Sequence, residues 1–148
     1  MSVEQNKDIV RRVEEAWDAG RLDALDAHFA PDFTSYATIP GMAPNLETAK
    51  MAHQMSIQAF PDRKTVIEDL IGEGDNVVAR IRMTGTNQGG LPWFGIPANG
   101  NKVAVGWIGI YQLKDGKIVS HRAEMDVLGL MQQLGAIPAP GAAPAAAG

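Results

Sequence analysis

The order of the elements along the chain predicts an α+β fold. Over the first 60 residues apolar side chains recur at helical spacing, whereas from Lys64 onwards they alternate with polar ones, as they do in strands. Asp115-Gly116 separates two segments rich in Val, Ile, Trp and Tyr, which is a strong signal for a β-hairpin. Because the helices precede the strands, we expect N-terminal helices packed on one concave face of a mostly antiparallel sheet, followed by a short C-terminal helix.

The first helix is expected over Val3–Asp18, where Ile9, Val13 and Trp17 recur every four residues. Gly20 follows it as a C-terminal cap. The charged residues of this helix lie mostly outside its apolar stripe: Glu4, Lys7, Arg11, Glu14 and Glu15.

The next elements are shorter. Residues 22–29 predict a second helix, which Pro31 stops, and residues 33–39 predict a short strand. Asn45 is a suitable N-cap for a third helix, which ends at Phe60.

The sheet is expected to continue with strands over residues 64–71 and Asn76–Thr86. Residues 87–101 then hold four glycines and two prolines around Trp93-Phe94. Such a segment is either a flap over a cleft or a long connection whose aromatic side chains plug one end of the core. The pattern alone leaves both interpretations open.

Length and composition indicate a single domain over residues 1–135, which ends in a helix over residues 127–134. Residues 136–148 are rich in Ala, Pro and Gly and carry no charge. They cannot bury enough surface to become ordered, so we predict a disordered tail.

Charge and cysteine content narrow the class of protein. The net charge is −4 and no basic stripe is present, so we expect no nucleic-acid partner. The absence of cysteine excludes disulfides and fits a reducing cytoplasm. With no signal-peptide pattern and no apolar run of membrane-spanning length, we expect a cytoplasmic protein without a membrane partner.

The hairpin register decides which side chains share a face of the sheet. If Asp115-Gly116 is a two-residue loop, counting outward places Trp107 opposite Glu124. The face with Trp107 would then carry Val105, Trp107, Gly109, Tyr111, Ser120, Arg122, Glu124 and Asp126. The opposite face would carry Gly106, Ile108, Ile110, Val119, His121, Ala123 and Met125.

Three charged side chains on a face with an indole and a phenol indicate the wall of a cleft, because a dry core would not hold them unpaired. The alternative is a solvent-facing polar strip with two stray aromatic residues. The second face, which holds Ile108 and Ile110, suits self-association through a flat contact between sheets.

No metal or phosphate motif is found. The histidines His28, His53 and His121 are dispersed, and no His-Glu-x-x-His spacing occurs. The glycine-rich segments lack the Lys-Ser/Thr of phosphate loops, and no Gly-x-Ser-x-Gly elbow is present. We therefore expect no metal site and no Ser nucleophile of that type.

Asp126 is the candidate for chemistry, and it has two interpretations. It stands where a strand gives way to a helix, so it is a good N-cap. At the deep end of a half-apolar cleft, desolvation would instead raise its pKa towards that of a useful general acid/base. Arg122 and Glu124 either pair with each other along the strand, or tune Asp126 and hold a substrate oxygen.

Several motifs in this order resemble those of the SnoaL-like polyketide cyclases, also called ester cyclases. They are Phe60-Pro-Asp, Glu68-Asp-Leu-Ile-x-Glu-Gly-Asp, Asp115-Gly-Lys-Ile-Val-x-His and Asp126-Val-Leu-Gly-Leu-Met-Gln-Gln-Leu-Gly. Each motif is weak alone, but the ordered set is specific and covers nearly everything up to Gly135.

The resemblance implies a cone-shaped α+β barrel of the kind shared with nuclear transport factor two and ketosteroid isomerase. It also implies homodimers or higher homo-oligomers that pair through the sheet. Characterised members close polyketide rings by intramolecular aldol condensation without metal or cofactor. Their acid/base is an aspartate before the final helix, and Asp126 is the matching position.

The chain departs from its relatives at three positions. Many relatives carry His where this chain has Tyr36 and Asn87, and Trp where it has Arg122. The pocket is therefore expected to be more polar than is typical of the family.

The leading hypothesis is acid/base ring closure of a hydrophobic, oxygenated, polyketide-like substrate, with Asp126 as the acid/base. Tyr36, Asn87 and Arg122 would stabilise the enolate oxygen. The apolar walls would be Met51, Met55, Trp93, Trp107 and Tyr111.

Three alternatives stay open. One is an epoxide hydrolase that uses Arg122 with Asp126 and Glu124, and another is a ketosteroid-isomerase-like enzyme. The third is a non-catalytic module that binds a small molecule.

Overall fold

The computed structural model of the protein describes residues 1–36 and 41–141. Its strands are β1 (Phe29–Ser35), β2 (Lys64–Glu73), β3 (Asn76–Thr86), β4 (Lys102–Lys114) and β5 (Lys117–Met125). Its α-helices are α1 (Val3–Asp18), α2 (Leu46–Ala59) and α3 (Val127–Gln133), and two short 3₁₀ helices are η1 (Leu22–Ala27) and η2 (Pro92–Phe94).

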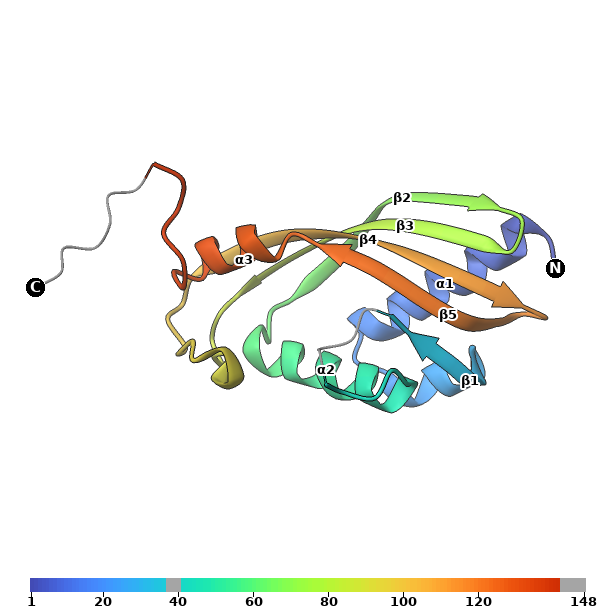
Figure 1. Cartoon of the computed structure of the whole chain (residues 1–148), viewed down its shortest axis with the longest axis horizontal. Coiled ribbons are helices and arrows are strands. Elements are labelled where there is room, and N and C mark those ends of the chain that lie inside the picture. The colour runs from blue at the N-terminus through green and yellow to red at the C-terminus, as the bar shows by residue number, and fades with distance from the viewer. Residues whose placement is uncertain (37–40, 142–148) are drawn as a thin grey trace, which may run out of the picture.

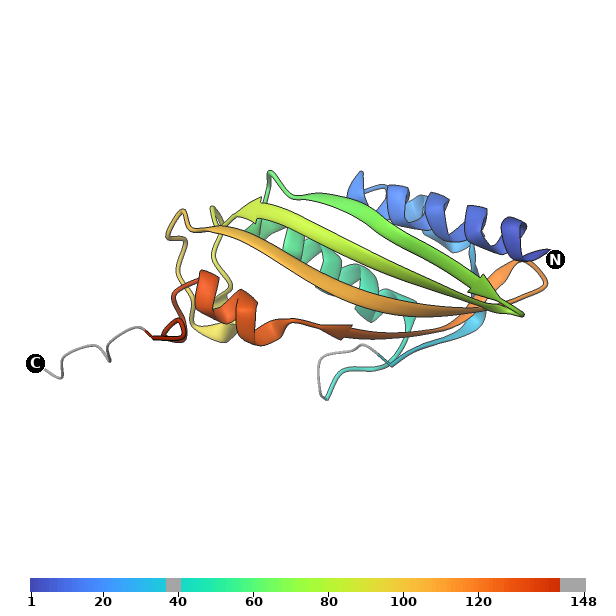
Figure 2. The same cartoon turned by 90° about the horizontal axis from the view of Figure 1, so that it is seen from above.

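The strands form one sheet in the order β1-β5-β4-β3-β2. β1 runs parallel to β5, and the other neighbouring strands are antiparallel. The sheet is curved, α1 and α2 lie across its concave side, and α3 follows β5 at the far end (Figure 1; Figure 2). These features confirm the predicted α+β class with a mostly antiparallel sheet and a short C-terminal helix.

Two helices begin where the sequence predicts. At the start of α1, the Gln5 backbone N–H donates to Ser2 Oγ (3.1 Å), and the Ser2 N–H donates to Gln5 Oε1 (2.8 Å). At the start of α2, Asn45 Oδ1 accepts from the Thr48 N–H (2.9 Å). These side chains satisfy N–H groups that the first turn of a helix leaves without a partner.

The predicted second helix is wrong in its C-terminal part. Only η1 forms, and Phe29 and Pro31 belong to β1. Proline is tolerated there because β1 is an edge strand whose register shifts between Phe29 and Thr34, so no regular ladder needs the missing N–H. β1 ends at Ser35, and Ile39, the predicted end of this strand, lies outside the described residues.

The β4–β5 hairpin turns at Asp115-Gly116 as predicted, but its register changes two residues into β5. Leu113 pairs with Ile118 and Gln112 with Ser120, so Val119 is an extra residue, a β-bulge. Beyond a bulge every side chain of the strand exchanges faces, because side chains alternate with a period of two. Beyond Val119 the pairs are Tyr111–His121, Gly109–Ala123 and Trp107–Met125.

The predicted division of the hairpin into faces is therefore wrong beyond the bulge. His121 and Met125 share the concave face with Trp107. Arg122 and Glu124 lie on the outer face, opposite Ile110 and Ile108 in the ladder, and all four of these residues are exposed.

Two apolar clusters fill the space between the helices and the sheet. The first includes Val13 of α1 and Ile118 of β5, and the second includes Phe60 after α2 and Leu134 after α3. Trp107 of β4 packs against both clusters. The region where they meet is thus built around a single indole.

Residues 142–148, which make up most of the predicted disordered tail, lie outside the described residues, so its disorder stays a prediction. Among the residues that are described, no helix is both long and apolar enough to cross a lipid bilayer.

Candidate functional site

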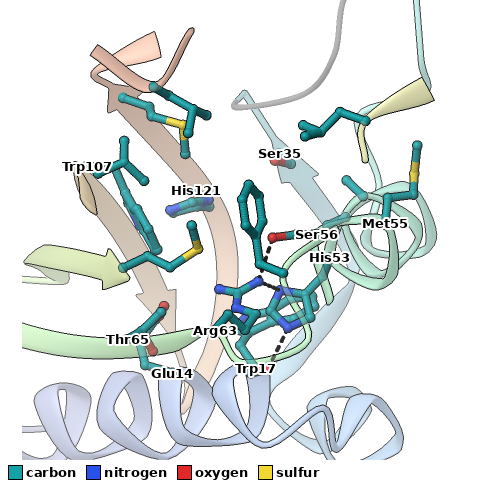
Figure 3. A pocket seen from close by; sticks show the side chains of 18 of the residues that line it. Glu14, Trp17, Ser35, His53, Met55, Ser56, Arg63, Thr65, Trp107 and His121 are labelled. Atoms are coloured by element: carbon teal, nitrogen blue, oxygen red, sulfur yellow. Dashed lines mark hydrogen bonds between the residues drawn. The ribbon is translucent and has the colours of Figure 1, made fainter. Parts of the chain in front are cut away.

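A cavity of about 400 Å³ lies between the concave face of the sheet and the helices (Figure 3). Residues of both apolar clusters line this cavity. It therefore lies where the two clusters meet and where their side chains leave space unfilled. Its walls are mainly apolar, with Trp17, Phe29, Phe33, Met55, Phe60, Met83, Val105, Trp107 and Met125 among them. A cavity of this size and character suits a hydrophobic small molecule.

Glu14 of α1 is a buried carboxyl group on the cavity wall. The Tyr111 hydroxyl donates a hydrogen bond to its Oε1. Burial raises the pKa of Glu14 from 4.5 to about 7, although the hydrogen bond from Tyr111 and the positive charge of Arg63 work in the opposite direction. At neutral pH this carboxyl therefore exists in both protonation states.

Arg63 and His53 form a second polar group on the floor of the cavity. Arg63 Nη1 donates to Ser56 Oγ (2.9 Å) and lies 3.4 Å from His53 Nδ1. His53 Nε2 lies 2.5 Å from the Trp17 carbonyl oxygen, so Nε2 carries the proton and Nδ1 is the acceptor that faces Arg63. Burial, followed by the charge of Arg63, lowers the pKa of His53 to about 4, and the ring is neutral at pH 7.

His121 reaches the cavity from β5. Its ring stacks on Tyr111 with centroids 4.4 Å apart. The stack is possible because residue 109 is glycine: a Cβ there would lie 2.7 Å from His121 Nε2. Burial lowers the pKa of His121 to about 4, so this imidazole is also neutral at pH 7.

Trp93 and Phe94 of η2 line the cavity and remain 51% and 55% exposed. This arrangement agrees with a flap over the cavity better than with a plug in the core.

Asn87 anchors the same loop: Nδ2 donates to the Pro97 carbonyl and to Asn99 Oδ1 (3.0 Å each). Its Oδ1 accepts from the Gly90 N–H (2.9 Å). Asn87 is fully buried and does not line the cavity.

The structure brings only part of the predicted site together. Four of the predicted binding residues line the cavity: Met55, Trp93, Trp107 and Tyr111. Six predicted site residues do not line it: Tyr36, Met51, Asn87, Arg122, Glu124 and Asp126. Arg122 instead stacks over the exposed ring of Tyr36, with Cζ 4.7 Å from the ring centroid.

Asp126 is exposed and caps α3, where Oδ1 accepts from the Gly129 N–H (2.9 Å). Its neighbour Met125 lines the cavity, but Asp126 does not. The capping role is thus observed, and the acid/base role stays a prediction that rests on the family resemblance.

Sequence reasoning missed Glu14, Arg63 and His121 as cavity residues. A signal for Glu14 was present: it follows Val10 by four residues and precedes Trp17 by three, so it falls inside the apolar stripe of α1. No comparable signal existed for His121, because its face depends on the bulge at Val119. Across residues 1–36 and 41–141, no three or more His, Asp or Glu side chains are grouped so that they could hold a metal ion.

A curved, mostly antiparallel sheet that wraps over helices around an apolar cavity defines the class of nuclear-transport-factor-two-like proteins. The chain belongs to the SnoaL-like polyketide cyclase family, whose model matches residues 7–134. This confirms the resemblance seen in the ordered motifs.

Solved structures of similar proteins support the same assignment. TsrD from Streptomyces laurentii is 32% identical, with a TM-score of 0.76, and the match covers 88% of this chain and 97% of that one. A candidate SnoaL-like polyketide cyclase from Jannaschia sp. CCS1 is 29% identical, with a TM-score of 0.78 and coverage of 91% and 94%. AclR from Streptomyces galilaeus, described as a candidate hydroxylase, is 25% identical, with a TM-score of 0.82 and coverage of 93% and 85%. No curated protein matches significantly.

The raised pKa of Glu14 has a consequence for stability. Below pH 4.5 the carboxyl is protonated in both the folded and the unfolded chain, and above pH 7 the folded protein must bury a charge. The stability that the protonated group contributes is therefore lost as the pH rises through 7. Glu14→Gln keeps the shape without the charge, so its stability relative to the wild type should increase by about 2–3 kcal/mol between pH 5 and pH 8.

Urea unfolding of both proteins at the two pH values measures this difference. The histidines are the same in both proteins, so their contributions to the pH dependence of stability cancel. Glu15→Gln, on the exposed side of the same helix, should show no comparable change. A pH-independent difference between wild type and Glu14→Gln would contradict the raised pKa.

Proposed function

We propose that the protein catalyses acid/base ring closure of a hydrophobic, polyketide-like substrate, an intramolecular aldol-type reaction that the family resemblance implies to be free of cofactors. The observation that supports this best is a carboxyl group in the wall of an apolar cavity, with its pKa raised to about 7. A group that must both accept and return a proton works best when its pKa lies near the working pH. Glu14 meets that requirement.

In the proposed cycle, ionised Glu14 removes a proton from the carbon next to a substrate carbonyl. The enolate carbon attacks a second carbonyl of the same molecule, so that a carbon–carbon bond forms and the second oxygen becomes an alkoxide. Glu14 then returns its proton to this alkoxide and regains its starting state. Because Tyr111 donates to Oε1, Oε2 is the oxygen left to carry the proton.

The walls of the cavity would contribute by folding the substrate. Ring closure needs two distant carbonyl groups of one flexible chain to meet, and confinement lowers the entropic part of that barrier. Trp107 and Met55 face the cavity from opposite sides, from the sheet and from α2 (Figure 3). A flat polyketide chain would be held between them.

Asp126 is the competing acid/base, because the family resemblance places the catalytic aspartate at this position. We favour Glu14 because it lines the cavity and is buried, whereas Asp126 is exposed and is engaged in capping α3. Substitution separates the two assignments.

Exchange of the α-protons of 1-tetralone in D₂O, followed by NMR, reports the proton-transfer half of the reaction without the natural substrate. The Glu14→Gln variant should exchange about 100-fold or more slowly than the wild type, because it cannot accept a proton. Asp126→Asn should retain exchange, since its amide oxygen can still accept from the Gly129 N–H.

The reverse pattern, with full exchange in Glu14→Gln and loss in Asp126→Asn, would move the chemistry to Asp126. No catalysed exchange by the wild-type protein with any aryl ketone that binds would favour the non-catalytic binding module instead.

The other enzymatic alternatives are less well supported. Epoxide hydrolysis was based on Arg122, Glu124 and Asp126 sharing a cleft, and none of the three lines the cavity. A ketosteroid-isomerase-like proton shift would use the same proton transfers by Glu14 without forming a carbon–carbon bond. Analysis of the products distinguishes it from ring closure.

We also propose that two copies pair through the outer face of the sheet. Ile108 and Ile110 of β4 are exposed there, together with Val66 and Ile71 of β2. This corrects the predicted surface, because Ala123 and Met125 lie on the concave face. Exposed apolar side chains grouped on a sheet face are typical of an interface between subunits.

The cytoplasmic location expected from composition also stays a proposal.

Replacing Ile108 by Asp places a charge on this surface and should shift the mass measured by light scattering from dimer to monomer. The Leu128→Asp variant, at an exposed apolar position on α3, serves as the control and should remain dimeric. A wild-type protein that is monomeric at 100 μM would contradict pairing through this face; this is about the concentration at which even a weak interface becomes populated.

A further inference from the structure

Arg63 is a cation on the floor of the cavity without an ionic partner. Among the described residues, no carboxylate oxygen lies within 4.0 Å of its guanidinium. The exposed Arg80 and Arg82 on the outer sheet face, in contrast, both pair with Glu68. Of these three arginines, the one that lines the apolar cavity has no counter-charge within this distance.

Most of the hydrogen-bonding capacity of Arg63 is also unused. Its side-chain contacts run only from Nη1, to Ser56 and His53. In the described part of the chain, neither Nε nor Nη2 donates to any group, and Nε is buried. A guanidinium has five N–H donors in a fixed planar fork, and a carboxylate can accept two of them in parallel.

Two acidic groups influence the pKa of Arg63, but neither forms an ion pair with it. Asp18 and Glu14 act on Arg63 only through longer-range attraction, and Asp18 already accepts from the Thr65 N–H and hydroxyl (2.8 Å each). Desolvation is the largest influence on Arg63 and lowers its pKa, yet a guanidinium stays protonated at neutral pH. A buried cation of this kind is stabilised most by an anion that enters the same cavity.

The neighbours of Arg63 hold its guanidinium at the cavity wall. Ser56 and His53 hold Nη1 on the α2 side, and His53 is itself fixed by the Trp17 carbonyl (Figure 3). His53 is neutral, so it adds no charge of its own to the floor. The arrangement thus presents one positive charge to the cavity below the indole of Trp107.

We propose that the cavity floor is an anion subsite, in which Arg63 binds the carboxylate of an aromatic or polycyclic acid while the ring system lies in the apolar part beside Trp107. This deepens the proposed function and rests on it, because it names the substrate class of the same cavity: free acids rather than neutral esters. Glu14 lies on the same floor, so the anchored end of the molecule would be the end at which protons are moved.

The test compares binding of 2-naphthoate, its methyl ester and 2-naphthamide to the full chain at pH 6 by calorimetry. The acid should bind about tenfold or more tightly than the ester or the amide, because only the acid offers a charge-assisted pair of acceptors. Arg63→Met should bring the three affinities to within about twofold of one another. Arg11→Met, which removes an exposed guanidinium on α1, should keep the wild-type ratio.

Equal affinities of the wild type for acid and ester would overturn the proposal, and so would an unchanged ratio in Arg63→Met. If Arg63→Met fails to fold by circular dichroism, Arg63→Gln keeps a donor for Ser56 and gives the same two outcomes.

Glu14→Gln separates the subsite from the catalytic proposal. At pH 6 Glu14 is mostly protonated, so this variant should keep the preference for the acid even though it loses proton exchange. A strong preference for the acid in a wild-type protein without exchange would overturn ring closure alone. Exchange without any preference for the acid would overturn the anion subsite alone.

Discussion

A single extra residue, Val119, decides which side chains of β5 reach the cavity. Beyond this bulge the strand presents His121 and Met125 to the interior and turns Arg122 and Glu124 outwards. Without it, two charged side chains would project into an apolar space and the imidazole would face solvent. The chemical character of the interior therefore depends on a local irregularity of one hairpin, although the hairpin turn itself is regular.

The charges that remain inside are few, and burial determines each of them. Desolvation keeps His53 and His121 neutral at pH 7 and holds Glu14 near its titration point. Among the described residues that line the cavity, only Arg63 remains fully charged. A low-dielectric cavity strengthens the field of such an isolated cation, and a substrate that enters would meet one positive charge beside one carboxyl that changes its protonation state easily.

The sequence was sufficient to locate the long helices and strands, but it was insufficient for the first strand and for the site. Hydrophobic periodicity and the caps Ser2 and Asn45 are local, so α1 and α2 could be located correctly. The position of Val119 in a bulge depends on pairing with β4 and leaves no local signal, so the faces of β5 were assigned wrongly. Glu14 was overlooked for a different reason: its spacing indicated burial, but its charge suggested solvent.

At Gly109 the absence of one carbon atom lets an imidazole lie flat against β4. Any larger residue would push that ring off the strand and reduce the room above it. A substitution at Gly109 can thus change the shape of the cavity without changing Glu14 or Arg63. Through substitutions at this one position, related proteins could come to accept larger or smaller ligands and still carry out the same reaction.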